Sequence, residues 1–279
     1  FTGKRKRARS TMLRVANCLL GEDLGDDTLI IGTSGRYEFK NKGIDVFLES
    51  LNRLNRDKDL KKKVLAFVNV PGWVGDPRED LQKRLKSKNK FTEPLQCPFI
   101  THWLHNMTHD QVLDMLKYLG MGNRPEDKVK VIFVPCYQDG HDGILNKHYY
   151  DLILGEDLSV YPSYYEPWGY TPLESVAFRV PTITTDLAGF GLWVNSLKNQ
   201  HGINDGVEVL HRSDYNYSEV ADGIKDTVAL FSTKTEAEIK EIRKRAGQVA
   251  EQALWKHFIQ YYYEAYDIAL RNAMKRQLK

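Results

Sequence analysis

Residues 161–174 read YPSYYEPWGYTPLE, and this stretch decides most of what the chain reveals about its fold and function. A short apolar strand runs into an aromatic loop that proline and glycine interrupt, and the loop opens a helix. Glu166 lies on the loop and Glu174 on the helix behind it. The first backbone N–H groups of the helix are those of Gly169, Tyr170 and Thr171. Phosphate groups bind well at such a helix start, so the stretch predicts a phosphate site beside two carboxylates.

Apolar runs of strand length recur along the chain, and helical stretches separate most of them. The runs are 28–32, 64–70, 129–134, 158–161, 182–185 and 207–210. The helical stretches are 8–20, 44–55, 110–119, 147–154, 171–178 and 217–231. This alternation predicts an α/β fold with a parallel sheet and flanking helices, and the unbroken apolar strands indicate that both faces are covered. Ligands of such sheets bind outside the carboxyl ends of the strands, where residues 161–174 fall.

Three segments resemble the eukaryotic-type glycogen synthases. Residues 161–174 are similar to the family pattern F-P-S-Y-Y-E-P-W-G-Y-T-P-x-E and depart from it only at Tyr161. Residues 33–55 contain GRYEFKNKGIDVF, which matches G-R-Y-E-F-x-N-K-G-x-D-V-F at every fixed position. Residues 180–194 contain VPTITTDLAGFG, which resembles I-P-S-I-S-T-N-L-S-G-F-G. The resemblance covers roughly residues 8–270.

The resemblance implies a Rossmann-like domain that forms the C-terminal half of a GT-B glycosyltransferase. Residues 1–279 would be a single donor-binding domain, with a helical insertion at 71–127 and C-terminal helices at 234–279. The chain begins with Phe1, so we expect it to be part of a longer protein whose N-terminal Rossmann-like domain lies upstream. Insertions at this point make subunit contacts in the family, which implies a homo-oligomer; the alternative is that 71–127 is a solvated helical decoration.

The resemblance also assigns roles to individual residues. Arg36 and Lys42 would bind the diphosphate, and both are suited to stabilise the negative charge that grows on this leaving group. Glu166 would contact the hydroxyls of the donor sugar, and Glu174 the ribose. The backbone of Tyr170 and Thr171 and the Thr171 hydroxyl would bind phosphate, and Trp168 and Gly169 would surround the sugar. Tyr149 would stack on uracil, although packing in the core explains this residue nearly as well. We expect Gly189 and Gly191 to flank Phe190 in a flexible loop that gates the site or lines the acceptor.

The implied reaction is a retaining transfer of glucose from UDP-glucose to the non-reducing 4-hydroxyl end of an α-1,4-glucan such as glycogen. No paired aspartates precede a strand end, so we expect neither a metal nor another cofactor. Two alternatives remain: a catalytically inert nucleotide-binding or assembly module, and a GT-B transferase with a different acceptor. The sequence also leaves open whether the donor is UDP- or ADP-glucose. Only Lys240, Arg243, Lys244 and Arg245 remain of the family's arginine-rich regulatory helix, so activation by a sugar phosphate is not expected.

The composition excludes several other classes. A net charge of +3 is too small to indicate a nucleic-acid partner, and no run of 18 apolar residues indicates a membrane span. Three cysteines without metal-like spacing indicate reduced thiols and a cytoplasmic protein. His102, His105 and His109 have no neighbouring ligand pattern that would support zinc. The basic residues of 4–9 are expected to be a solvated helix start, with an arm for an anionic partner as the alternative.

The last 46 residues are expected to be helical, with a break near Trp255. Apolar and aromatic side chains at helical spacing form one broad face, from Trp255 through Phe258 and Tyr262 to Tyr266. We expect part of this face to pack on the domain's own sheet and the rest on the upstream domain.

Overall fold

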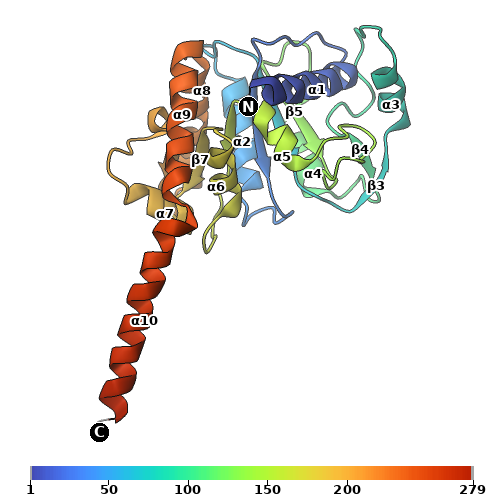
Figure 1. Ribbon diagram of the computed structural model, residues 1–279. Helices are drawn as coiled ribbons and strands as arrows, with labels where there is room; N and C mark the ends of the chain where they lie inside the picture. Colours follow the sequence, from blue (N-terminus) through green and yellow to red (C-terminus); the bar gives the residue numbers. More distant parts are fainter. Residues whose placement is uncertain (1, 278–279) are drawn as a thin grey trace.

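A computed structural model describes residues 2–277 of the protein. Its central sheet has six parallel strands: β1 (Leu29–Ser34), β2 (Val64–Asn69), β5 (Val129–Val134), β6 (Leu158–Val160), β7 (Thr182–Thr185) and β8 (Val207–Leu210). Their order across the sheet is β5–β2–β1–β6–β7–β8 (Figure 1). The expected parallel α/β fold is confirmed, and every expected strand lies within two residues of its predicted bounds.

Helices cover both faces of this sheet. On one face lie α1 (Thr2–Leu20) and the short α5 (Tyr149–Leu152), which runs into a 3₁₀ turn over Ile153–Gly155. On the other face, α2 (Ile44–Asn55) and α8 (Tyr217–Ser232) pack side by side. Alternate residues of a strand face opposite layers, so Leu29 and Ile31 join the core under α2 and α8 while Ile30 joins the core under α1. This double burial explains why the strands are rich in apolar and β-branched residues.

The insertion at 71–127 is not purely helical. It contains α3 (Glu79–Lys86) and α4 (Gln111–Tyr118), but also a two-stranded antiparallel sheet of β3 (Val74–Pro77) and β4 (His102–Leu104). These strands are partly exposed and neither forms an apolar run, so the sequence did not reveal them. Residues 99–101 run along β5 and bond to Phe133, so the insertion covers an edge strand that would otherwise leave backbone groups unpaired.

Two residues of the basic run at 4–9 connect α1 to the start of β6. Arg5 and Arg9 of α1 bind the carboxylate of Asp157, at 2.5 and 2.6 Å, and Arg243 of α9 (Glu236–Gln252) reaches the same group at 3.3 Å. Burial alone would raise the pKa of Asp157, but the three guanidinium groups outweigh it and keep that pKa below its usual value. Two residues of the run are therefore committed to the domain's own interior.

Glu156, the neighbour of Asp157, is buried without a cationic contact. Its carboxyl group lies against Gly32 of β1, where any side chain would overlap it, and it accepts a hydrogen bond of 2.6 Å from the Ser159 hydroxyl. Burial raises the pKa of Glu156 to about 8, with a smaller contribution from the charge of Asp157. At neutral pH this side chain is therefore largely protonated.

The C-terminal helix leaves the domain instead of covering it. A capping box between Thr235 and Glu238 starts α9, and α10 (Trp255–Gln277) follows after a break at 253–254 (Figure 1). The expected break is confirmed, but the expected packing of α10 on the sheet is wrong. Phe258 in its first turns packs on Trp168 and Trp193, while most of its aromatic side chains are exposed.

Within residues 2–277, no helix combines the length and apolar character that crossing a bilayer requires.

Candidate functional site

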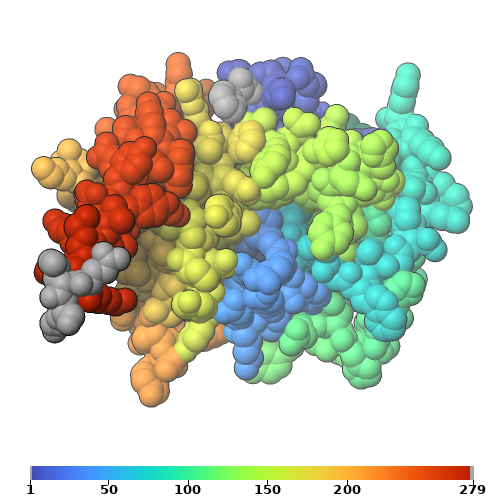
Figure 2. Space-filling view, turned by 60° about the horizontal axis from the view of Figure 1, so that its bottom comes forward, coloured from blue at the N-terminus to red at the C-terminus, as the bar shows by residue number. Residues whose placement is uncertain are grey.

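Two loops meet at the point where the sheet reverses its strand order. The chain moves from β1 to β2 and β5 on one side, and β6 starts the other half of the sheet beside β1. The loop after β1 (35–43) and the loop after β6 (161–169) therefore leave neighbouring strands at the carboxyl edge, where ligands of open α/β sheets bind. The Tyr164 N–H donates to the Asn41 carbonyl at 2.7 Å, and Figure 2 shows the two segments in blue and yellow on one face.

Gly43 permits this close approach. It is the N-cap of α2 with φ of 68°, a conformation that favours glycine. A Cβ at this position would overlap the backbone of Pro162 in the second loop. Arg212, just beyond β8, also donates to the Pro162 carbonyl, and burial lowers the pKa of this guanidinium group. Arg212 was missed in the sequence, although its place after a strand's carboxyl end was a usable signal.

Lys42 and Glu166 form an ion pair across the two loops. The ammonium group donates directly to Oε2 of Glu166, and the side chains are only 13% and 18% exposed. Lys42 precedes α2, whose N-terminal dipole disfavours a cation, so the carboxylate opposite it offsets that repulsion. Because the pair is partly buried, the removal of either partner leaves the other with an uncompensated charge that interacts strongly with nearby groups.

Arg36 lies at the same edge in a more open position. Its side chain is 75% exposed and pairs with Glu38 at 3.0 Å. Such an exposed pair contributes little to stability and exchanges partners readily. The next residue, Tyr37, is fixed because its hydroxyl donates to Asp110 at 2.8 Å and accepts from the Val112 N–H at 3.0 Å. The start of α4 in the insertion thus anchors the loop that carries Arg36.

The helix α6 (Tyr170–Ala177) begins at the end of the second loop. Its N-cap is Gly169, with φ of 103° and no side-chain cap, so no capping side chain occupies the first N–H groups. Tyr170 is exposed and Thr171 half-buried. The N-terminus of α6 therefore joins that of α2 at this edge, and both favour an anion.

Trp168 packs into an aromatic cluster below the loop. Its ring lies 6.0 Å from Phe190, 5.9 Å from Trp193 and 5.5 Å from Phe258 of α10, measured between centroids. The expectation of a flexible loop around Phe190 is wrong, because Gly189 already begins α7 (Gly189–Asn195) and Phe190 is fully buried. A Cβ at Gly189 would overlap the Pro167 carbonyl, so this glycine brings α7 against the loop.

Glu174 and two tyrosines of α5 form the remaining side of the site. The Tyr149 hydroxyl shares a hydrogen bond of 2.8 Å with Ser34 at the end of β1, and burial raises the pKa of Tyr149 well above its usual value. The Tyr150 hydroxyl donates to Oε1 of Glu174 at 2.8 Å. Tyr150 was not singled out in the sequence, because nothing distinguishes it there from its neighbour.

One group of side chains resembles a metal site but does not fit one. Donor atoms of His102, Cys136 and Asp142 lie within 4.8 Å of one another. His102 donates from Nε2 to the Asp142 carbonyl at 2.7 Å, and its Nδ1 bonds to the Thr101 hydroxyl. The Asp142 carboxylate accepts from the N–H groups of residues 144–146, and burial raises the pKa of Cys136 to about 12. The group therefore fixes a loop, and the three cysteines are free thiols as expected.

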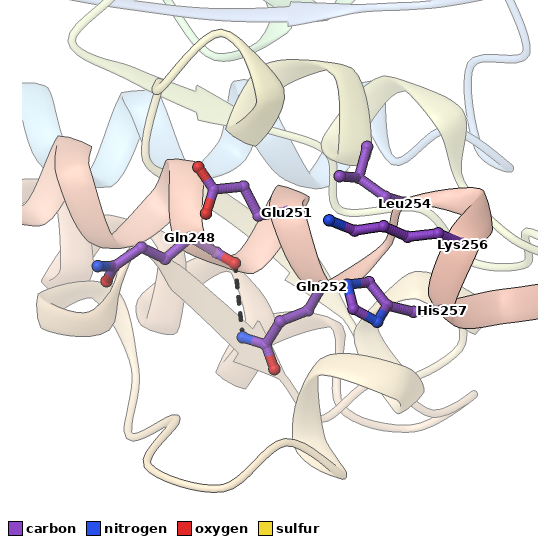
Figure 3. A pocket seen from close by; sticks show the side chains of 6 residues that line it. All are labelled: Gln248, Glu251, Gln252, Leu254, Lys256 and His257. Atoms are coloured by element: carbon purple, nitrogen blue, oxygen red, sulfur yellow. Dashed lines mark hydrogen bonds between the residues drawn. The ribbon is translucent and has the colours of Figure 1, made fainter.

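A hollow of another kind lies at the junction of α9 and α10. Figure 3 shows its six lining residues: Gln248, Glu251, Gln252, Leu254, Lys256 and His257. All six are exposed, so the hollow is an open surface groove. None of them belongs to the two loops that bring Lys42 and Glu166 together.

The sequence model of the glycogen synthase family matches residues 20–78 and 76–279. This chain belongs to the glycogen synthase family. It is 28% identical to glycogen [starch] synthase of Neurospora crassa over an alignment 304 positions long, which covers 89% of this chain and 42% of that protein. Isoform 2 of Saccharomyces cerevisiae is 29% identical, over 91% of this chain and 44% of the relative. The Caenorhabditis elegans protein is 32% identical over 239 residues, 67% of this chain and 35% of the relative.

The chain thus spans less than half the length of these relatives. Among solved structures, WaaG, a glycosyltransferase involved in lipopolysaccharide biosynthesis, is similar with a TM-score of 0.49 and 14% identity, over 90% of this chain and 47% of that one. The family membership confirms the resemblance drawn from the three sequence segments.

Proposed function

We propose that this chain is the donor-binding half of a retaining glycosyltransferase that transfers glucose from UDP-glucose to the 4-hydroxyl end of an α-1,4-glucan. The Lys42–Glu166 pair supports this proposal more than any other observation. It places a cation suited to a diphosphate and a carboxylate suited to sugar hydroxyls at one point, between two helix N-termini.

Each residue has a defined part in the proposed reaction. Arg36 and Lys42, with the first N–H groups of α6, hold the diphosphate and stabilise its charge as the bond to the anomeric carbon breaks. Glu166 orients the sugar, Glu174 accepts from the ribose, and Tyr149 flanks the base. The acceptor hydroxyl attacks on the face that the diphosphate leaves, and a phosphate oxygen takes its proton. These cations do the work of a divalent metal, so the proposed transfer needs none.

The proposal also covers partners. The acceptor would be glycogen, and its contacts would come from an N-terminal domain of the same protein in the cytoplasm. Copies would associate through surfaces of this domain that are exposed in a single chain.

Calorimetric titration with UDP and with ADP tests the proposal directly. We expect UDP to bind more tightly than ADP, and Arg36→Ala to lose about 1.5–3 kcal/mol of binding free energy, the range for hydrogen bonds to charged groups. Arg56→Ala is the matched control, since Arg56 is exposed at the opposite end of α2. Equal UDP affinity in the wild type and Arg36→Ala would reject the assignment of the diphosphate site.

A further inference from the structure

Tyr150 connects α5 to α6 beside the proposed donor site. Its hydroxyl donates to Oε1 of Glu174 at 2.8 Å, although the residue is 49% exposed. The ring stacks on Phe178 at the end of α6, with centroids 5.4 Å apart and planes inclined by 23°. It also lies 5.3 Å from the ring of Tyr149. Two aromatic neighbours therefore fix the direction in which the Tyr150 hydroxyl points.

The bond to Tyr150 occupies one of the two carboxylate oxygens of Glu174. Among residues 2–277, Glu174 makes no other side-chain hydrogen bond or ion pair, so Oε2 remains available. A glutamate on a helix surface otherwise samples several rotamers, and ordering it on binding costs side-chain entropy. The hydrogen bond to Glu174 raises the pKa of Tyr150, so the hydroxyl stays a donor at neutral pH. The carboxylate is thus ordered before a ligand arrives.

We propose that Tyr150 is a positioning residue that aims the free oxygen of Glu174 at a single ribose hydroxyl of the nucleotide. This inference rests on the proposed function, in which Glu174 binds the ribose. One oxygen held by Tyr150 leaves room for one strong contact, instead of a clamp on both the 2′- and 3′-hydroxyls. Tyr150 acts through Glu174 and sets how strongly the domain distinguishes a ribonucleotide from a deoxyribonucleotide.

The test compares UDP with 2′-deoxy-UDP and 3′-deoxy-UDP in calorimetric titrations of the 279-residue chain. In the wild type, we expect one of the two deoxynucleotides to bind clearly more weakly than UDP. Tyr150→Phe keeps the ring on Phe178 and removes only the hydroxyl. It should weaken UDP binding roughly threefold to tenfold, because the ribose contact loses its orientation but is not removed, and leave binding of the discriminated deoxynucleotide within about twofold.

A double-mutant cycle separates positioning from direct contact. In the Glu174→Ala background, Tyr150→Phe should change UDP affinity by less than about twofold, because the group through which it acts is gone. Within one variant, the ratio of UDP affinity to deoxynucleotide affinity does not depend on the folded fraction, so a loss of stability alone cannot mimic a loss of discrimination. Tyr118→Phe is the matched control, since Tyr118 is exposed at the end of α4 in the insertion.

The outcomes distinguish this inference from the proposed function. If the wild type does not bind UDP, or Glu174→Ala leaves UDP affinity unchanged, the proposed role of the site fails and the inference falls with it. If Glu174→Ala weakens UDP binding while Tyr150→Phe keeps full discrimination between UDP and its deoxy analogues, the inference alone is overturned. Equal losses from Tyr150→Phe with and without Glu174 also overturn it, because they would indicate direct contact.

Discussion

Replacing Glu156 by glutamine should make the stability of the domain less dependent on pH. The carboxyl group is buried against Gly32 and bonded to Ser159, and its pKa is about 8 where an exposed glutamate has 4.5. The folded state therefore binds this proton more tightly than the unfolded state. The contribution of this proton to the free energy of unfolding is fully present below about pH 4.5 and is lost as the pH rises towards 8.

The magnitude follows from the two pKa values. Each pH unit between them should lower the free energy of unfolding of the wild type by about 1.4 kcal/mol, up to about 5 kcal/mol in total. Glutamine resembles the protonated carboxyl group in size and can still accept from Ser159. Glu156→Gln should therefore be close to the wild type at pH 5 and several kcal/mol more stable at pH 8, on the order of the total above.

Urea unfolding followed by tryptophan fluorescence at pH 5, 6, 7 and 8 measures this difference. Glu126→Gln is the control, because Glu126 is exposed and should give curves that follow the wild type at every pH. A constant difference between Glu156→Gln and the wild type from pH 5 to pH 8 would show that Glu156 is already ionised in the folded state, and the reasoning would be wrong.

Three further predictions concern the site and α10. Glu166→Gln removes a negative charge that pairs with Lys42 and would repel a diphosphate, so UDP should bind several-fold more tightly in calorimetry. Weaker binding would contradict this reasoning. UDP affinity should be the same in EDTA as in magnesium, and a metal-dependent gain would reject the metal-free proposal. The exposed face of α10 should make the chain self-associate, and Tyr262→Glu with Tyr266→Glu should shift it towards monomer in light scattering without loss of UDP binding. A strictly monomeric wild type at high concentration would refute this.

Much of the sheet could be predicted from the sequence, because its strands are short runs rich in apolar and β-branched residues that helical stretches separate. The expected ranges 129–134, 182–185 and 207–210 coincide with β5, β7 and β8. The meeting of Lys42 and Glu166 also follows from the fold, since loops after neighbouring parallel strands share one edge. The strands β3 (VGDP) and β4 (HWL) escaped because both have residues exposed to solvent and neither forms an apolar run.

Contacts between distant charged residues could not be predicted. Asp157 binds Arg5, Arg9 and Arg243, and nothing in the local sequence of any of them indicates the others. The same holds for Tyr150, whose importance comes from the side chain opposite it on α6. Periodicity reports which residues are buried, but the pairing of polar groups is set by how the helices are placed on the sheet.

Because α10 packs on the domain near its base, through Phe258, it has mechanical leverage over the loop at 161–169. A helix of 23 residues is about 34 Å long, so a rotation of about 10° at its base moves its far end by about 6 Å. The short arm of this lever is Phe258, whose ring rests on Trp168, two residues from Glu166. A force applied to the distal turns of α10 thus becomes a larger force acting over a smaller displacement at Trp168, close to Glu166, the residue proposed to orient the sugar.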